Sequence, residues 1–227
     1  MLVLAIDTAL AACSAAVLDT GQGAMLASES TPMARGQAEL LMPMIARVMD
    51  RAGVDFAQLD RIAVTTGPGS FTGLRVGIAA ARGLALAAGK PAIGLSTLAA
   101  FAAPHIAADD SVPVVAAIDA RHAQVYLQVF GPGGRTLVSP RIATQREAVR
   151  AAAMERARVV GSGAELVVAA WPNNIEPPLV VDTAAAPDID WVARLGAAAA
   201  EGQAPPKPLY LRAPDAQPQD AAQLPRR

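Results

Sequence analysis

The stretch LAIDTALAACSAAVL at residues 4–18 returns in outline as AAIDARHAQVYLQVF at residues 116–130. In each copy an apolar strand ends in an aspartate, Asp7 or Asp119, and a short turn leads into a second apolar strand. A third strand is predicted after each pair. The six strands are predicted over residues 2–7, 13–18, 24–30, 114–119, 124–130 and 136–142. One structural unit is therefore predicted to occur twice in the chain.

The remainder of each unit alternates helices with strands. A helix over 37–52 is indicated by the apolar spacing of Leu41, Ile45 and Val48, with Gly53 as its C-cap and Pro43 near its first turns. A strand at 61–66, a helix at 72–88, a strand at 91–95 and a helix from 96 follow. The second half is predicted to contain a helix capped by Thr144, a strand at 158–160, a turn and helix at 161–170, a strand at 179–181 and a helix at 189–200.

Both halves thus follow the order βββαβαβα, an α/β arrangement. Two such halves in tandem resemble the superfamily of actin, sugar kinases and Hsp70, in which a nucleotide lies between the domains. The predicted division is an N-terminal subdomain at 1–107, a C-terminal subdomain at 108–202 and a proline-rich tail at 203–227. The end of the tail is expected to be disordered.

Composition narrows the possible functions. The chain has 227 residues, 19 basic and 20 acidic side chains and a net charge of −1, so it has no basic surface for binding nucleic acid by itself. One cysteine, Cys13, excludes an internal disulfide, and two histidines offer little for a zinc site. We expect no bound metal.

The N-terminus is apolar, but it lacks a basic leading region and contains Asp7 within the apolar run. The longest alanine-rich stretch, residues 73–89, carries Arg75 and Arg82 and is short for a bilayer of about 30 Å. We expect a cytoplasmic protein without a membrane anchor.

A glycine-rich turn lies in TTGPGSFTGLRVGIAAARGLALA, residues 65–87. A strand leading through glycines into a helix resembles a phosphate-binding loop. The templates fail, however, because Gly73 is followed by Leu74 and Arg75, and Thr72 stands where a dinucleotide turn needs glycine. We favour a structural turn in which Gly67 and Gly69 permit positive φ and Ser70 or Thr72 caps the helix.

Small residues recur every four positions along the following helix, at Gly73, Gly77, Ala81, Ala85 and Gly89. This spacing leaves a face that another backbone can approach closely. The face could pack on the chain's own sheet or on a partner, and the residues alone leave both possibilities open. Met42, Met44 and Met49 on the preceding helix suit an adaptable apolar contact.

Asp7 and Asp119 occupy the positions where an actin-like ATPase would hold its metal and water. The turns that follow them contain no glycine, so the nucleotide cleft is predicted to be degenerate and both aspartates are favoured as turn caps. Cys13 is expected to be buried and inert, which leaves no nucleophile for catalysis.

The residues closely resemble those of one family, the bacterial tRNA threonylcarbamoyladenosine biosynthesis subunit TsaB, also called YeaZ. GPGSFTGLRVG at 67–77 is the most specific motif. The resemblance extends almost end to end, through LAIDTALAACSAAV at 4–17, LLMPMI at 40–45, GPGSFTGLRVGIAAARGLALA at 67–87, GLSTLAAFA at 94–102, VVAAIDARHAQVY at 114–126 and PLYLR at 208–212.

The resemblance implies two actin-like subdomains in a non-catalytic subunit. Its partners would be the catalytic subunit TsaD, as a heterodimer, and the small ATPase TsaE. ATP and metal are expected on those partners, no cofactor is expected on this chain, and tRNA would be reached only through the complex. Gln37 departs from the pattern, because relatives often have histidine there.

In the family, the helices matching 37–52 and 72–88 pack against the equivalent pair of TsaD. Replacing Gly77 with Leu would then block the partner and leave the chain folded. The implied interface residues are Met42, Ile45, Met49, Gly73, Gly77, Ala81 and Ala85. The glycine-rich loop is a separate group of candidate residues, Gly67, Gly69, Ser70, Thr72 and Arg75.

Three alternatives remain. An actin-like ATPase or sugar kinase would bind ATP between the halves. The absence of glycine in the turns after Asp7 and Asp119 argues against this alternative. A peptidase would need a metal or nucleophile that the sequence does not offer. A homodimer could use the same helix face when the partner is absent.

Overall fold

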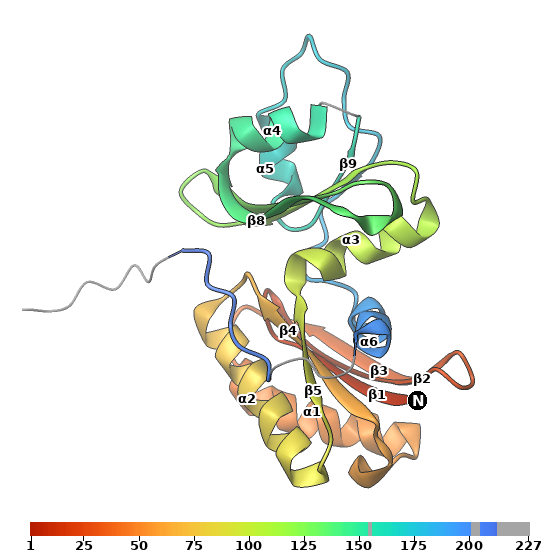
Figure 1. Cartoon of the computed structure of the whole chain (residues 1–227). Coiled ribbons are helices and arrows are strands. Elements are labelled where there is room, and N and C mark those ends of the chain that lie inside the picture. Colours follow the sequence, from red (N-terminus) through yellow and green to blue (C-terminus); the bar gives the residue numbers. More distant parts are fainter. Residues whose placement is uncertain (154–155, 201–204, 213–227) are drawn as a thin grey trace, which may run out of the picture.

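The computed structural model describes residues 1–153, 156–200 and 205–212, which form two lobes, each built on a five-stranded sheet (Figure 1). The strand order is β3-β2-β1-β4-β5 in the first sheet and β8-β7-β6-β9-β10 in the second, so the two sheets have the same topology. The strands are β1 (Leu2–Asp7), β2 (Ala12–Asp19), β3 (Ala24–Pro32), β4 (Arg61–Gly67), β5 (Ala92–Ser96), β6 (Val114–Asp119), β7 (Gln124–Phe130), β8 (Thr136–Thr144), β9 (Arg158–Val160) and β10 (Val181–Asp182). The predicted duplication and the actin-like fold are confirmed.

In the part of the chain that the structure describes, six α-helices complete the two units in the predicted order. They are α1 (Gln37–Ala52), α2 (Phe71–Ala88), α3 (Thr97–Ala108), α4 (Gln145–Ala153), α5 (Ala164–Ala169) and α6 (Ile189–Ala198). Two single 3₁₀ turns, η1 (Phe56–Gln58) and η2 (Pro132–Gly134), interrupt the connections.

The predicted helix caps are present. Gly53 ends α1 in the left-handed region at φ 64°, and the Ser70 hydroxyl accepts a hydrogen bond from the Gly73 N–H at the start of α2. Thr144 forms a capping box with Glu147, in which each side chain bonds the other residue's backbone N–H. Pro43 lies inside α1, in its second turn. These local signals fix where the helices begin and end.

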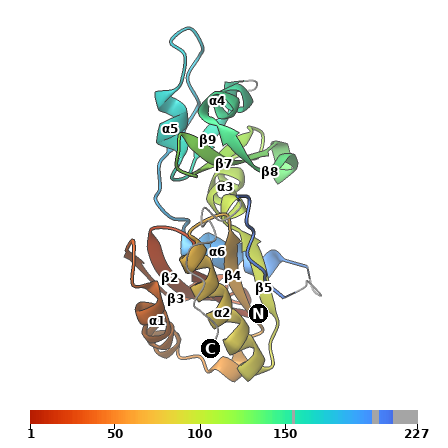
Figure 2. The ribbon, with the colours of Figure 1, turned by 90° about the vertical axis from the view of Figure 1, so that its left-hand side faces the viewer.

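The central strand β1 is buried on both faces because helices cover the first sheet on both sides. Leu4 and Ile6 pack with α1 and α2, while Val3 and Ala5 point to the opposite face and pack with α6. Figure 2 shows α1 and α2 on the same side of this lobe. The two apolar sets of one strand therefore belong to different layers of the core.

The last helix of each half packs across to the other sheet. Leu98 and Phe101 of α3 join the core of the second lobe with Val114 and Ile118, whereas α6 packs on β1, β2 and β4 of the first lobe. Figure 1 shows α3 lying between the sheets and α6 against the lower one. The division predicted at 107/108 places α3 in the first subdomain and α6 in the second. In the structure, each of these helices packs on the sheet of the other half.

By length and composition, α2 is apolar enough to cross a membrane, with a mean hydropathy of 1.3. One third of it is buried, and it carries Arg75 and Arg82. Its inner face packs with β1 and β4 in the core of the first lobe.

Candidate functional site

The first turns of α2 press against the loop that follows β1. A Cβ on Gly73 would overlap the carbonyl oxygen of Thr8, and one on Gly77 would lie 2.5 Å from the Thr8 hydroxyl oxygen. That hydroxyl donates a hydrogen bond to the Gly73 carbonyl at 2.7 Å. Glycine is required at both positions by the chain's own packing.

This arrangement corrects the interpretation of the small-residue face. Ala81 and Ala85 continue the same face into the core, where they pack with Ile45 and Met49 of α1. Six of the seven predicted interface residues are therefore covered by the chain itself, and only Met42, 47% exposed, lies at the surface. A leucine at Gly77 would strike Thr8 inside its own lobe.

The outer faces of α1 and α2 combine exposed small and apolar residues with charged ones, among them Arg47 and Arg82. Leu86 is 86% exposed, and Met42 on α1 is also open. Gly83 is exposed, and a Cβ added to it would have no neighbour within 4 Å among the described residues. The exposed or half-exposed small and apolar residues here are Met42, Ala46, Val76, Ala79, Ala80, Gly83, Leu86 and Ala87, which we call the outer helix face.

The glycine-rich loop forms the turn between β4 and α2. Gly67 has φ 116°, a conformation that favours glycine. Gly69 does not have positive φ; instead, a Cβ there would overlap the Ala9 carbonyl, which accepts a hydrogen bond from the Ser70 N–H at 2.7 Å. The Ser70 N–H of the glycine-rich loop therefore holds the loop that follows β1.

Residues 205–212, the strap, run from the edge of the first sheet to the second lobe. The Leu209 N–H donates to the Thr66 carbonyl at 2.7 Å, and the Tyr210 ring lies 5.4 Å from that of Phe71. Arg212 donates to the Ala120 carbonyl at 2.7 Å and to the Gln124 side chain. The strap therefore joins α2 to the β6–β7 turn, while the tail end expected to be disordered, 213–227, lies outside the described residues.

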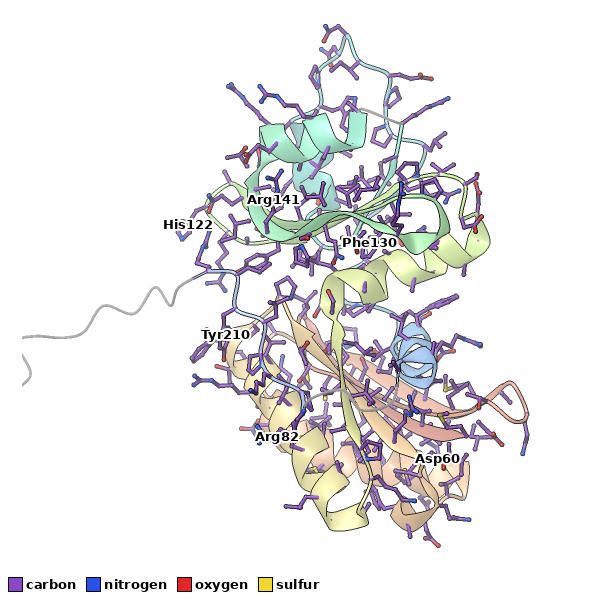
Figure 3. All side chains as sticks on the ribbon, viewed as in Figure 1. Asp60, Arg82, His122, Phe130, Arg141 and Tyr210 are labelled. Carbon is purple, nitrogen blue, oxygen red and sulfur yellow. The ribbon has the colours of Figure 1, made fainter. Side chains whose placement is uncertain are left out.

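A cavity of about 570 Å³, the interlobe cleft, lies between the lobes. Its walls are the glycine-rich loop with the start of α2, the β6–β7 turn and the strap. Figure 3 shows Tyr210 on the strap and His122 on that turn, on the same side of the molecule. The volume falls within the roughly 300–1,000 Å³ of ligand pockets.

Asp7 does not face this cleft. Its carboxyl is fully buried, and Oδ1 accepts hydrogen bonds from the Thr65 hydroxyl and from the Ala9 N–H at 3.2 Å, while Oδ2 has no partner among the described residues. Burial raises the pKa of Asp7 to about 6, although the bonds from Thr65 and Ala9 act in the opposite direction. Asp7 is a buried turn cap in this structure.

Asp119 lines the cleft and also caps its own turn. Its carboxylate accepts a hydrogen bond from the Arg121 N–H at 2.7 Å. The next residues, Arg121, His122 and Ala123, have φ of 63°, 52° and 55°, although none of them is glycine. The two strand-end aspartates are thus equivalent in the fold but not in their exposure.

Cys13 is buried in β2, and the pKa of its thiol is raised to about 11 by burial, with smaller contributions from Asp7 and Glu29. The thiol is therefore protonated at neutral pH and a poor nucleophile. Within the described ranges, no group of three or more His, Cys, Asp or Glu side chains could hold a metal.

Comparison with known proteins places this geometry in a family. A family model described as "TsaD: tRNA N6-adenosine threonylcarbamoyltransferase" matches residues 31–178. The tRNA threonylcarbamoyladenosine biosynthesis protein TsaB of Haemophilus influenzae is 35% identical over 171 residues, which cover 70% of this chain and 71% of that protein. The chain belongs to the TsaB family. The TsaB of Escherichia coli is 39% identical over 126 residues, 56% of this chain and 53% of that protein, so this match spans about half of the relative's length.

Solved structures agree with this assignment along almost the whole chain. A Pseudomonas aeruginosa protein described as similar to peptidase YEAZ superposes with a TM-score of 0.79 and 32% identity, covering 93% of this chain and 99% of that one. The P. aeruginosa YeaZ structure gives a TM-score of 0.78. The likeness to these TsaB-family structures therefore extends over both lobes.

Gln37, where this TsaB-family chain departs from the expected histidine, is buried at the start of α1, and its Nε2 donates to the Met33 carbonyl at 3.4 Å. The strap was not predicted to belong to a site. The signal was present, because PLYLR is an apolar and aromatic segment within a proline-rich tail.

Proposed function

We propose that this TsaB-family chain is a non-catalytic subunit of the machinery that forms threonylcarbamoyladenosine in tRNA. The TsaB relatives from E. coli and H. influenzae are named for that biosynthesis, and the matching family model bears the name of the transferase TsaD. In this proposal the chain forms a heterodimer with a TsaD-like subunit and acts with a TsaE-like ATPase in the cytoplasm.

The side chains that could react, Asp7 and Cys13, are buried in the core of the first lobe, and this supports a non-catalytic subunit. Asp7 is buried under the loop after β1, and the Cys13 thiol is held protonated. ATP, metal and the transfer step are therefore assigned to the partner subunits, and tRNA is brought to this chain within the complex.

The outer helix face is the observation that carries the partner proposal. Leu86 is 86% exposed on a long helix, with the small residue Gly83 and the exposed Arg82 one turn before it, and it leaves apolar area in water that a second protein can cover. The small residues let a partner helix approach closely, and Leu86 supplies the side chain that the partner buries. We assign this face, rather than the covered Gly73–Gly77 face, to the TsaD-like subunit.

The test is size exclusion with light scattering on the chain alone and mixed with the TsaD-like subunit of the same organism. We expect one copy of each subunit, loss of the complex for Leu86→Glu, and an intact complex for Leu137→Glu, which changes an exposed leucine on β8 of the second lobe. Two separate species with the unaltered chain would contradict the proposal. A dimer of the chain alone that Leu86→Glu also dissolves would show that the same face serves self-association.

A further inference from the structure

Positive charge surrounds the interlobe cleft. Arg121 and Arg212 line it, and Arg75 lies beside it, with its guanidinium carbon 3.7 Å from the centre of the Phe71 ring and its Nε donating to the Tyr210 hydroxyl at 3.2 Å. Among the described lining residues the acidic side chain is Asp119, which already accepts the Arg121 N–H. These walls are suited to an anion.

The backbone holds Arg121 at the cleft in a conformation that side chains disfavour. Arg121 begins the run of three left-handed residues, and the Arg212 guanidinium fixes the turn from the other side through Ala120 and Gln124. Backbone outliers that persist are held by their surroundings and gather at functional sites. The turn therefore presents Arg121 in a defined place.

Aromatic rings stand next to these charges. Tyr126 and Tyr210 line the cleft, and Phe71 and Tyr210 are 45% and 46% exposed, although aromatic side chains make up only 4% of the sequence. Exposed rings beside arginines provide surfaces on which bases can stack. The cleft thus combines contacts for phosphate with contacts for a base.

The hydrogen-bond donors that line the interlobe cleft favour a singly charged phosphate group over a triphosphate. A bound nucleoside triphosphate uses successive backbone N–H groups and a divalent metal. Here the Ser70 N–H is bonded to Ala9, Asp7 is buried away from the cleft, and the turn after Asp119 presents side chains in place of glycine backbone. Separate guanidinium groups instead match the single charges spaced along a nucleic-acid strand.

From these contacts we infer that the interlobe cleft binds the phosphodiester backbone of a single-stranded RNA segment, with bases stacking on Tyr126 and Tyr210. This inference rests on the proposed function, because the machinery acts on tRNA. It gives this chain a direct contact with the RNA, which departs from the expectation that tRNA is reached only through the complex: the net charge of −1 does not preclude a local group of arginines at the cleft.

The test measures binding of the full chain to a fluorescein-labelled oligouridylate by fluorescence anisotropy at several salt concentrations. Arg121→Gln is expected to weaken binding about fivefold at low salt and to reduce the slope of log affinity against log salt by about 0.7. Tyr126→Leu should weaken binding without changing that slope. Arg146→Gln, an equal charge change on α4 at the far side of the second lobe, should leave both unchanged (Figure 1).

Equal affinities of Arg121→Gln and the unaltered chain would overturn the inference, as would failure of the unaltered chain to bind the oligonucleotide. Displacement of the oligonucleotide by ATP at far lower concentration than by uridine oligomers would reassign the cleft to a mononucleotide and also overturn it. Light scattering with the TsaD-like subunit, run on the same Arg121→Gln protein, separates the two proposals. A heterodimer with unaffected RNA binding refutes only the cleft, and RNA binding through Arg121 without a heterodimer refutes only the partner assignment.

Discussion

Thr8 and Gly73 lock the loop after β1 onto the first turn of α2. The Thr8 hydroxyl donates to the Gly73 carbonyl at 2.7 Å, and the Thr8 carbonyl oxygen occupies the space that a Cβ on Gly73 would take. Both residues belong to the first lobe. The close approach that the glycines allow is thus needed for folding before any partner is present.

Glycine-to-alanine changes along α2 should therefore have opposite signs at its two faces. We expect Gly73→Ala to lower the free energy of unfolding by about 1–3 kcal/mol or more, because backbone must move to admit the Cβ. Gly83→Ala, on the open face, should raise it by up to about 1 kcal/mol, the usual gain in a helix interior. Urea unfolding followed by circular dichroism measures both, and equal stability of the two variants would contradict this packing.

The packing of the small-residue face at Gly73 and Gly77 could not be predicted from the sequence. Spacing of four residues reveals that one helix face is small, but it does not reveal what covers that face. The duplication, the caps at Ser70 and Gly53 and the turn role of Asp119 were predictable, because each depends on residues near one another in the sequence. Local chemistry determines these features.

Long-range contacts escaped prediction for a related reason. Apolar periodicity identified the helix at 189–200, but nothing in it states that α6 returns to the first sheet. Proline content predicted disorder only for the end of the tail, and it gave no sign that Leu209 and Arg212 bond to backbone groups far away in the sequence. The cleft depends on that strap, and therefore its walls could not be assembled from local patterns.

Asp7 should make stability depend on pH in an unusual direction. Its pKa is raised to about 6 in the folded chain and is near 4 when unfolded, so the folded state binds the extra proton. The stabilising contribution is present in full below about pH 4 and is lost as the pH rises through 6. Glu29 and Asp109 have lowered pKa values and act in the opposite direction, so the comparison must isolate Asp7.

Asp7→Asn provides that comparison. Between pH 7.5 and 4.5 the free energy of unfolding of the unaltered chain should rise by about 2 kcal/mol relative to Asp7→Asn, because asparagine cannot take up the proton. Urea titrations of both proteins across this range measure the difference. A difference that stays constant with pH would show that Asp7 is not held in the buried environment described.

Arg61 should be needed to hold α6 on the first lobe. Its guanidinium is buried at the start of β4, where Nη1 donates to the carbonyls of Gly196 at 3.1 Å and Ala199 at 2.8 Å. A cation at a helix C-terminus is also favoured by the helix dipole. Arg61→Met should lower the free energy of unfolding by about 1–3 kcal/mol by leaving these carbonyls without their donor.

Hydrogen exchange distinguishes this local effect from general destabilisation. Amides of α6 should exchange faster in Arg61→Met, while those of α4 in the second lobe keep their protection. Arg146→Gln, which alters an exposed arginine on α4, is the matched control. Uniform loss of protection in both helices would show that Arg61 does not act through α6.

Arg212 should decide whether the strap stays bound to the second lobe. Its guanidinium bonds to the Ala120 carbonyl and to Gln124, while the Leu209 N–H remains bonded to Thr66 in the first lobe. Arg212→Gln removes the charge-assisted bonds beyond Tyr210, so the bond between Tyr210 and Leu211 should open to chymotrypsin about tenfold faster. Mass spectrometry of the released fragment measures this rate. Arg146→Gln should leave it unchanged, and equal cleavage of Arg212→Gln and the unaltered chain would mean that Leu209 and the Phe71–Tyr210 contact hold the strap without Arg212.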